Sequence, residues 1–394
     1  MTSPEPEVVP RHLDEMARST LHQALIRPLV LERIPAWLSV PLVMLVAALP
    51  SILWSENLRI SVAGMAASLA VLDWLSLRLL PVARVSYGPV NPPFFSLTFI
   101  RGGINGIVGL AGATWQGFAW LVVFQSVITI ISIYTQWIEP QWITVTHRNL
   151  RSPRLHAGAP AIRMLHLGDL HHERPAQREE RLQHLVRRLN PDLILFSGDF
   201  VSLSYNEDPE TLAGARRIIS EWKAPFGVYA VSGTPLVESS ETVARILDGL
   251  NIRWLRDETV TLDIRGQRIS VSGVSVSHII DNDAHRMQRV VKEAPADSLR
   301  VLLFHAPDVA PQAAEAGVAL YLCGHTHGGQ IRLPFYGALI TSSKLGKRYE
   351  MGAYRVGSMI LYVTRGIGLE GASAPRARFL CPPEITLWTL EGES

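Results

Sequence analysis

Four short segments of the chain carry aspartate and histidine side chains that could act together on a metal ion. Carboxylate oxygens combined with imidazole nitrogens suit Mn²⁺, Fe or Zn²⁺, whereas a structural zinc or iron–sulfur site needs clustered thiolates. The two cysteines, Cys323 and Cys381, do not form a C-x-x-C pair and are expected to be free thiols. The four segments are Asp169-Leu170-His171, Gly198-Asp199, His305 and His325-Thr326-His327.

The surrounding pattern predicts an α/β domain from residue 139 onward. Short apolar runs alternate there with polar helical stretches, such as the charged stretch 177–189. Each apolar run ends in a polar cluster, which is where open α/β sheets carry their sites. The runs expected to form buried strands are 162–167, 193–196, 228–231, 301–304 and 320–323.

In two of the four segments, the candidate residues are two positions apart in the sequence. Asp169 and His171 would face the same side of an extended backbone. His325 and His327 have the same spacing, and the glycines around them leave the backbone free to fold tightly. We expect both rings of this second pair to point the same way.

Two further histidines lie close to these segments. A lone histidine inside an apolar run is usually a core residue, so His166 is expected in the core. His172 directly follows the D-L-H segment and is expected at the surface. Neither is predicted to bind a ligand.

These motifs together resemble those of the calcineurin-like metallophosphoesterases, specifically their membrane-anchored bacterial branch. The resemblance covers roughly residues 142–390. It implies a four-layer α/β/β/α sandwich with two divalent metal ions, Mn²⁺, Fe or Zn²⁺. The matching strings are D-L-H at 169, S-G-D-F-V at 197, F-H-A-P-D at 304, G-H-T-H-G-G-Q-I-R-L-P at 324, V-T-R-G-I-G at 363 and C-P-P-E-I at 381.

The resemblance also implies how the ions are held. A metal-bound hydroxide then attacks phosphorus, so that no protein side chain is assigned as the nucleophile. The implied ligands are Asp169, His171 and His327 for one ion, His305 and His325 for the second, and Asp199 bridging both.

One loop departs from the family pattern. After the run 228–231 the family has G-N-H-[DE], but this chain reads Gly233-Thr234-Pro235-Leu236. Thr234 replaces an asparagine ligand of the second ion, and Pro235 replaces a histidine that stabilises the transition state or protonates the leaving group. Loss of one general acid costs about 10²- to 10⁴-fold when the leaving group needs a proton. Occupancy of the second site is therefore open, and a phosphoanhydride is expected to be the better substrate.

The first third of the chain is apolar enough for transmembrane helices. Ile34–Trp54 contains about twenty uncharged residues, the length that crosses a bilayer. Ile60–Leu80 is a second candidate, with Asp73 expected to face the bundle or the membrane interface. Ile104–Tyr134 crosses once with a tilt or forms a tight hairpin around Thr114 to Gly117. Three or four helices are therefore expected.

Three regions follow from this pattern: an N-terminal cytoplasmic or interfacial segment at 1–33, a transmembrane region at 34–138 and the metallophosphoesterase domain at 139–394. Apolar positions within 11–33 fit a helix on the membrane surface or a lead-in to the first crossing. Arginines flanking the helices favour a cytoplasmic catalytic domain on a multi-pass protein of the cell inner membrane. They are Arg11, Arg18, Arg27, Arg33, Arg148, Arg151 and Arg154.

The sequence thus predicts a membrane-anchored, metal-dependent enzyme that hydrolyses phosphodiester or pyrophosphate bonds. Its expected partners are the membrane and a phosphorylated small-molecule or lipid substrate, for example a lipid-linked nucleotide. The net charge of +2 does not indicate a nucleic-acid partner. The alternative is a degenerate domain that binds metal or a phosphorylated ligand without turnover.

Overall fold

The computed structural model describes residues 20–393, and its internal contacts divide the chain into two compact units. One unit comprises Met1–Ile138 with Gly371–Arg376, and the other comprises Glu139–Glu370 with Ala377–Ser394. The first part of the helix expected within 11–33, including Arg11 and Arg18, lies outside the described residues.

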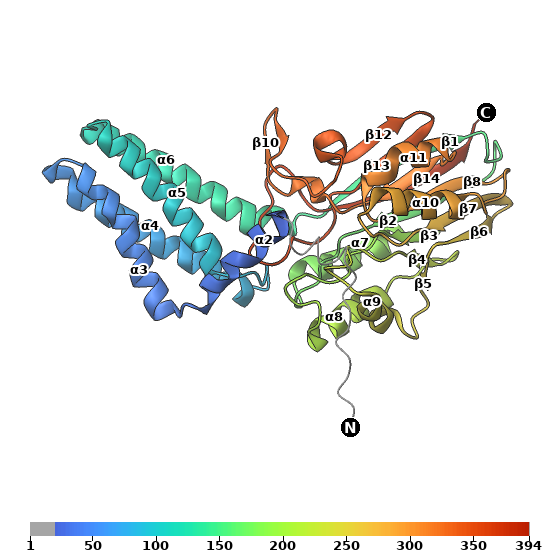
Figure 1. Ribbon diagram of the computed structural model, residues 1–394, viewed down its shortest axis with the longest axis horizontal. Helices are drawn as coiled ribbons and strands as arrows, with labels where there is room; N and C mark the ends of the chain where they lie inside the picture. The colour runs from blue at the N-terminus through green and yellow to red at the C-terminus, as the bar shows by residue number, and fades with distance from the viewer. Residues whose placement is uncertain (1–19, 394) are drawn as a thin grey trace, which may run out of the picture. The chain divides into compact units, whose positions relative to one another are not determined.

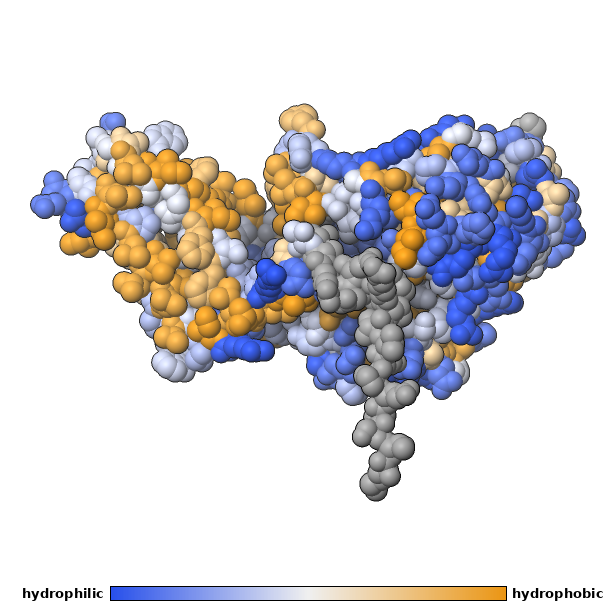
Figure 2. Space-filling view, viewed as in Figure 1, coloured by the Kyte–Doolittle hydropathy of each residue, from blue (hydrophilic) through white to orange (hydrophobic). Residues whose placement is uncertain are grey.

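The first unit is helical, and much of its surface is apolar (Figures 1 and 2). Three spans are long and apolar enough to cross a membrane, at Ala36–Leu53, Glu56–Val82 and Trp115–Gln141. Its elements are α2 (Thr20–Ile26), η1 (Arg27–Arg33), α3 (Ala36–Ala48), η2 (Leu49–Leu53), α4 (Glu56–Val82), α5 (Asn91–Leu110), α6 (Trp115–Ile133) and η3 (Tyr134–Ile138).

The uncharged stretch 104–134 forms a helical hairpin and not one tilted crossing. Helix α5 ends at Leu110 and α6 begins at Trp115, so the turn precedes the expected position. Gly112, at φ 71°, allows the chain to reverse there. Helix α5 also begins earlier than the apolar pattern indicated, with Pro92 and Pro93 in its first turn, where proline is well tolerated.

Asp73 faces the interior of the bundle and pairs with Arg101 of α5. The guanidinium Nε lies 2.8 Å from Asp73 Oδ2, and Nη2 lies 2.9 Å from Oδ1. Arg101 also donates to Gln125 and Thr129 of α6. Every one of these side chains is buried. Because an unpaired charge among apolar helices is costly, this network ties α4, α5 and α6 together.

The second unit contains two six-stranded sheets and a small hairpin. The sheet orders are β1-β14-β2-β3-β4-β5 and β12-β13-β9-β8-β7-β6, and β10 pairs with β11. The strands are β1 (Thr144–Ser152), β2 (Ile162–Leu167), β3 (Leu193–Phe196), β4 (Val228–Ala230), β5 (Arg253–Trp254), β6 (Glu258–Ile264), β7 (Gln267–Gly273), β8 (Leu299–Leu303), β9 (Leu320–Cys323), β10 (Arg332–Leu333), β11 (Gly337–Ala338), β12 (Gly352–Val356), β13 (Met359–Val363) and β14 (Glu384–Gly392).

Helices cover the outer face of each sheet. Those packed on the first sheet are α7 (Gln177–Leu189), α8 (Pro209–Ser220) and α9 (Ser240–Leu247); those on the second are α10 (Ile280–Val291) and α11 (Ala310–Glu315). Four 3₁₀ segments complete the unit: η4 (Glu139–Gln141), η5 (Pro307–Val309), η6 (His327–Gly329) and η7 (Gly346–Tyr349).

A third core lies between the two sheets, which makes the unit the predicted four-layer α/β/β/α sandwich. Successive strand residues enter different cores, because side chains alternate across a sheet. On β2, Met164 belongs to the core that also contains Val271 and Leu322 of the second sheet, whereas Leu165 belongs to the core beneath α7, α8 and α9. The central strands β3 and β9 are thus buried on both faces, and their residues are apolar.

We expect Asp73→Ala to destabilise the full-length protein by about 3–5 kcal/mol, because it leaves the buried Arg101 charge unpaired. Thermal unfolding in detergent would measure the loss. Replacing both partners, Asp73→Leu with Arg101→Leu, should recover most of it, and Arg78→Ala, at an exposed position of the same helix, should have little effect. A single Asp73→Ala variant as stable as the wild type would contradict a structural role for the pair.

Candidate metal centre

The candidate residues follow strands of both sheets, at the ends where the parallel strands stop. Asp169 and His171 follow β2, and Asp199 follows β3. His305 follows β8, and the segment from His325 to His327 follows β9. Because β2 and β3 are parallel, as are β8 and β9, their carboxyl ends supply side chains from two edges to one place.

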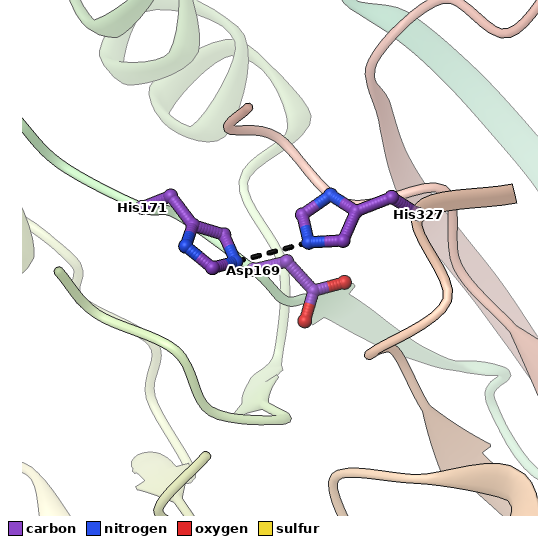
Figure 3. Close-up of side chains that lie close together, drawn as sticks. All are labelled: Asp169, His171 and His327. Atoms are coloured by element: carbon purple, nitrogen blue, oxygen red, sulfur yellow. Dashed lines mark hydrogen bonds between the residues drawn. The ribbon is translucent and has the colours of Figure 1, made fainter. Parts of the chain in front are cut away.

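One group consists of Asp169, His171 and His327, whose ligand atoms lie within 4.8 Å of one another. Figure 3 shows the two rings facing each other, with the carboxylate of Asp169 beside them. The two Nε2 atoms are 2.9 Å apart. All three side chains are buried, so the group is held away from bulk water.

A second group consists of Asp199, His305 and His325, again with ligand atoms within 4.8 Å. His305 Nδ1 donates to the carbonyl of Ser197 at 2.9 Å, which leaves its Nε2 3.2 Å from Asp199 Oδ2. The same Asp199 oxygen lies 3.3 Å from His171 Nε2 of the first group. Asp199 therefore stands between the two groups.

Most of these residues have left-handed backbone conformations. The φ angles are 50° at Asp169, 40° at His171, 58° at Asp199, 71° at His325 and 50° at His327. The expectation of an extended backbone was therefore wrong at both pairs. Asp169 and His171 still enter one group, as expected, whereas the expectation that His325 and His327 point the same way was wrong. His325 and His327 point into different groups, because the chain turns at each residue.

Hydrogen bonds from neighbouring loops hold this backbone in place. Asp169 accepts the amide of His325 at 3.1 Å on each oxygen, which joins the loop after β9 to the loop after β2. Glu238 accepts from the amides of Asp199, Phe200 and Gly233 at 2.6–3.1 Å. At Gly233 and Gly324 an added Cβ would overlap the carboxylates of Asp199 and Asp169, so these loops require glycine.

The charges of the two groups follow from burial and mutual contact. Burial alone lowers the pKa of His171 and His305, but the adjacent Asp199 outweighs it and raises each to about 9. Burial and the charge of His305 lower the pKa of His325 to about 4, and burial with the charge of His171 holds that of His327 well below its usual value. Burial raises the pKa of Asp169 to about 6.

The geometry of the first group fits a bound divalent cation. The Nε2 atoms of His171 and His327 face each other at 2.9 Å, and Asp169 lies in the same group. Without an ion, a proton of His171, whose pKa is raised to about 9, lies between the two rings. A cation accepting a lone pair from each ring would take the place of this proton, and carboxylate with imidazole suits the divalent metals of hydrolases.

The altered loop after β4 places a hydroxyl beside the second group. Thr234 Oγ1 lies 3.2 Å from His305 Nε2, 3.4 Å from His325 Nδ1 and 3.2 Å from His278 Nε2. The amide of Thr234 also donates to Asp199 Oδ1 at 2.8 Å. Pro235 brings no imidazole to the site, as the sequence indicated.

Two residues of this region were not found from the sequence. His278 follows β7, and its ring centroid is 4.6 Å from that of His325. Burial and the charges of His325 and His305 hold the pKa of His278 well below its usual value. Glu238 lies beyond the altered loop. Neither belongs to a motif; only their positions after parallel strands could have indicated them.

The predictions for the two flanking histidines, His166 and His172, had different outcomes. His166 lies in the core as expected, 3.1 Å from Ser197 Oγ. His172 is fully buried and not at the surface, and its Nδ1 lies 2.6 Å from Glu179 Oε1 of α7. The expectation failed because helix α7 packs over this position, which the local sequence does not reveal. Both cysteines are free, as expected.

Comparison with known proteins finds a matching family and several similar bacterial proteins. The profile of the family described as calcineurin-like phosphoesterase matches residues 162–233. The uncharacterized metallophosphoesterase YkuE of Bacillus subtilis is 30% identical over 66% of this chain and 89% of its own length. Phosphodiesterase YaeI of Escherichia coli is 27% identical over 65% and 92%. The UDP-2,3-diacylglucosamine pyrophosphatase LpxG of Chlamydia trachomatis is 25% identical over 65% and 91%.

We expect Mn²⁺ binding to release protons and to strengthen as pH rises from 6 to 9. His171 and His305 are protonated in the metal-free protein below pH 9, and each must lose a proton to donate a lone pair. The apparent affinity should rise up to about tenfold per pH unit for each proton displaced. Calorimetry at pH 7 in buffers of different ionisation enthalpy would count the protons. Affinity that is independent of pH, without proton release, would contradict this assignment.

Proposed function

The chain belongs to the calcineurin-like metallophosphoesterases, and on that premise we propose that it is a membrane-anchored hydrolase of phosphodiester or pyrophosphate bonds in a lipid-linked substrate. In this proposal Asp169, His171 and His327 hold one divalent ion, and His305 and His325 hold a second. Asp199 contributes to both. The observation that carries the proposal is the convergence of these six side chains, from loops of two sheets, into two adjacent groups.

Bound divalent ions would supply a Lewis acid and an activated water for attack on phosphorus. The contribution of the chain is to hold the ligands in position. Ser197 fixes the ring of His305 through Nδ1, which directs Nε2 toward Asp199. Glu238 accepts the amides of Asp199 and Gly233, so one side chain joins the loops after β3 and β4. The short glycine-containing loops bring the ligands together without room for intervening side chains.

The leaving group is expected to be one that departs without a proton. Pro235 has no side chain that can donate one, and the hydrogen-bond partners of the Thr234 hydroxyl among the described residues are His278, His305 and His325. A phosphoanhydride leaves as a stabilised phosphate anion, whereas an alkyl phosphodiester needs more help from an acid. This favours a pyrophosphate bond, the type that the name of the Chlamydia relative describes.

An exposed apolar hairpin supports a lipid-linked substrate. The hairpin of β10 and β11, with the residues that follow it, carries Phe335, Tyr336, Leu339 and Ile340 at the surface, and Phe335 is 111% exposed. Figure 2 shows this apolar tip in orange, at the position labelled β10 in Figure 1. A cluster of large apolar side chains in water is unfavourable unless it contacts a ligand or a membrane.

The hairpin is connected directly to the metal groups. It begins after the 3₁₀ turn that contains His327, and an added Cβ at Gly329 would overlap Ala338 of β11. On the other side, Ser342 donates to the carbonyl of His325 at 2.9 Å. A hollow beside the tip is lined by Arg332, Leu333, Phe335, Tyr336, Gly337, Glu350 and Leu380. An acyl chain on this hairpin would therefore be held near the phosphate at the site.

We expect the purified full-length protein to hydrolyse bis(p-nitrophenyl) phosphate and UDP-2,3-diacylglucosamine with added Mn²⁺, with the pyrophosphate cleaved faster. Asp199→Ala should lower both rates by roughly 100-fold or more, because it removes the charge shared by the two groups. Asp297→Ala, at an exposed position, is the control. Bound metal without any turnover sensitive to Asp199 would support the degenerate binding domain instead.

The double variant Phe335→Ser with Tyr336→Ser should lower kcat/KM for the UDP-lipid by about tenfold or more, since each buried apolar side chain contributes about 1.5–3 kcal/mol. Hydrolysis of bis(p-nitrophenyl) phosphate by the same variant is the matched control and should be unchanged. Equal losses on both substrates would indicate damage to the metal loops. No loss on the lipid would remove the hairpin from substrate binding.

A further inference from the structure

We propose that His278 is a further nitrogen ligand of the second metal group, beside Asp199, His305 and His325. The inference rests on the proposed function, because it requires that this group holds an ion. It assigns a role to a histidine that belongs to no motif in the sequence. The chemical class of the ligand is a divalent transition metal that accepts imidazole.

The geometry around Thr234 supports this assignment. Three imidazole nitrogens, from His278, His305 and His325, lie within 3.4 Å of the single hydroxyl oxygen of Thr234. A hydroxyl has one proton to donate and two lone pairs, and is a weak metal ligand. Imidazole is the commonest metal ligand near neutral pH in its uncharged form. His278, which lies on another loop, therefore offers a stronger metal ligand at this position than the hydroxyl of Thr234.

The backbone at His278 is built like that at the candidate ligands. Its φ is 58°, and among the described residues only fourteen that are not glycine have positive φ; five of these are candidate ligands. A conformation this unfavourable persists only where its surroundings enforce it, and such residues gather at functional sites. His278 thus shares with the ligands a strained backbone that aims the ring into the centre.

Asp283 of α10 enforces that conformation. Its buried carboxylate accepts the amide of His278 at 3.0 Å and the amide of Ser277 at 3.0 and 3.1 Å on its two oxygens. The Ser277 hydroxyl also donates to it, at 2.6 Å. A carboxylate that holds two consecutive amides fixes the path of the loop, so the ring of His278 is positioned before any ion binds.

The sheet topology supports the same assignment of His278. β7, β8 and β9 are parallel neighbours in the second sheet, and the loops after β8 and β9 carry His305 and His325. His278 lies on the loop after β7, at the same edge. Its ring is centred 4.6 Å from that of His325 and 6.4 Å from that of His305. Three adjacent strands of one sheet thus each supply one imidazole.

The test is metal binding by the full-length protein in detergent, stripped with a chelator and reloaded with Mn²⁺ or Co²⁺. Equilibrium dialysis with elemental analysis counts the ions and measures both affinities. We expect two ions in the wild type, and in His278→Ala a second ion bound roughly 10- to 100-fold more weakly with the first unchanged. The visible absorption of bound Co²⁺ should change with the loss of a nitrogen ligand.

Two further variants complete the design. His285→Ala, at an exposed position of α10, should bind both ions like the wild type. His278→Gln keeps a side chain that can coordinate through oxygen and should recover part of the affinity, and it replaces the alanine variant if that protein does not fold. If His278→Ala and His278→Gln bind both ions with wild-type affinity and Co²⁺ spectrum, the inference is wrong and the proposed function stands. A wild type that binds no ion would overturn both.

Discussion

The buried carboxylate of Asp199 is the feature on which the rest of the centre depends. Its Oδ2 lies 3.3 Å from His171 Nε2 of the first group and 3.2 Å from His305 Nε2 of the second, so Asp199 lies between the two groups. A buried charge is stable only when it is paired and hydrogen-bonded. The charge of Asp199 raises the pKa of both imidazoles, and the amide of Thr234 satisfies its other oxygen. The positions of three loops are thereby coupled to one side chain.

The same requirement explains why the loops around the centre are short, strained and held by buried acids. Glu238 and Asp283 each accept consecutive backbone amides, at Asp199 and Phe200 and at Ser277 and His278. Arg378 is also fully buried, and its guanidinium donates to the carbonyls of Arg365, Gly366 and Gly368. Left-handed residues cannot be maintained by local preference alone, so these contacts supply the necessary constraint.

The helical unit also contains buried charged side chains that must be paired, here among apolar helices. Asp73 and Arg101 are each costly to bury alone, but together with Gln125 and Thr129 they form a closed hydrogen-bond network. Such a network joins helices that otherwise meet only through apolar packing. This favours a structural role for the Asp73 carboxylate, and it accounts for an arginine in α5, a helix that is not among the three candidate spans.

Much of this protein could be predicted from its sequence. Apolar runs followed by polar clusters identified the strands β2, β3, β4, β8 and β9, because buried parallel strands need apolar side chains on both faces. The G-H-T-H-G-G-Q segment and the D-L-H and G-D pairs pointed to the residues that the structure brings together in two groups. The long uncharged stretches indicated membrane helices, since only sustained apolarity can span a bilayer.

The contacts between residues far apart in the sequence were known only from the tertiary structure. The backbone turns left-handed at Asp169, His171, His325 and His327, so spacing along the chain did not reveal which rings face each other. His172 is buried by a helix packed over it, and Arg101 meets Asp73 from another helix. His278 reaches the second group from a strand that carries no motif. Each of these contacts joins residues far apart in sequence, where local pattern carries no information and packing determines the neighbour.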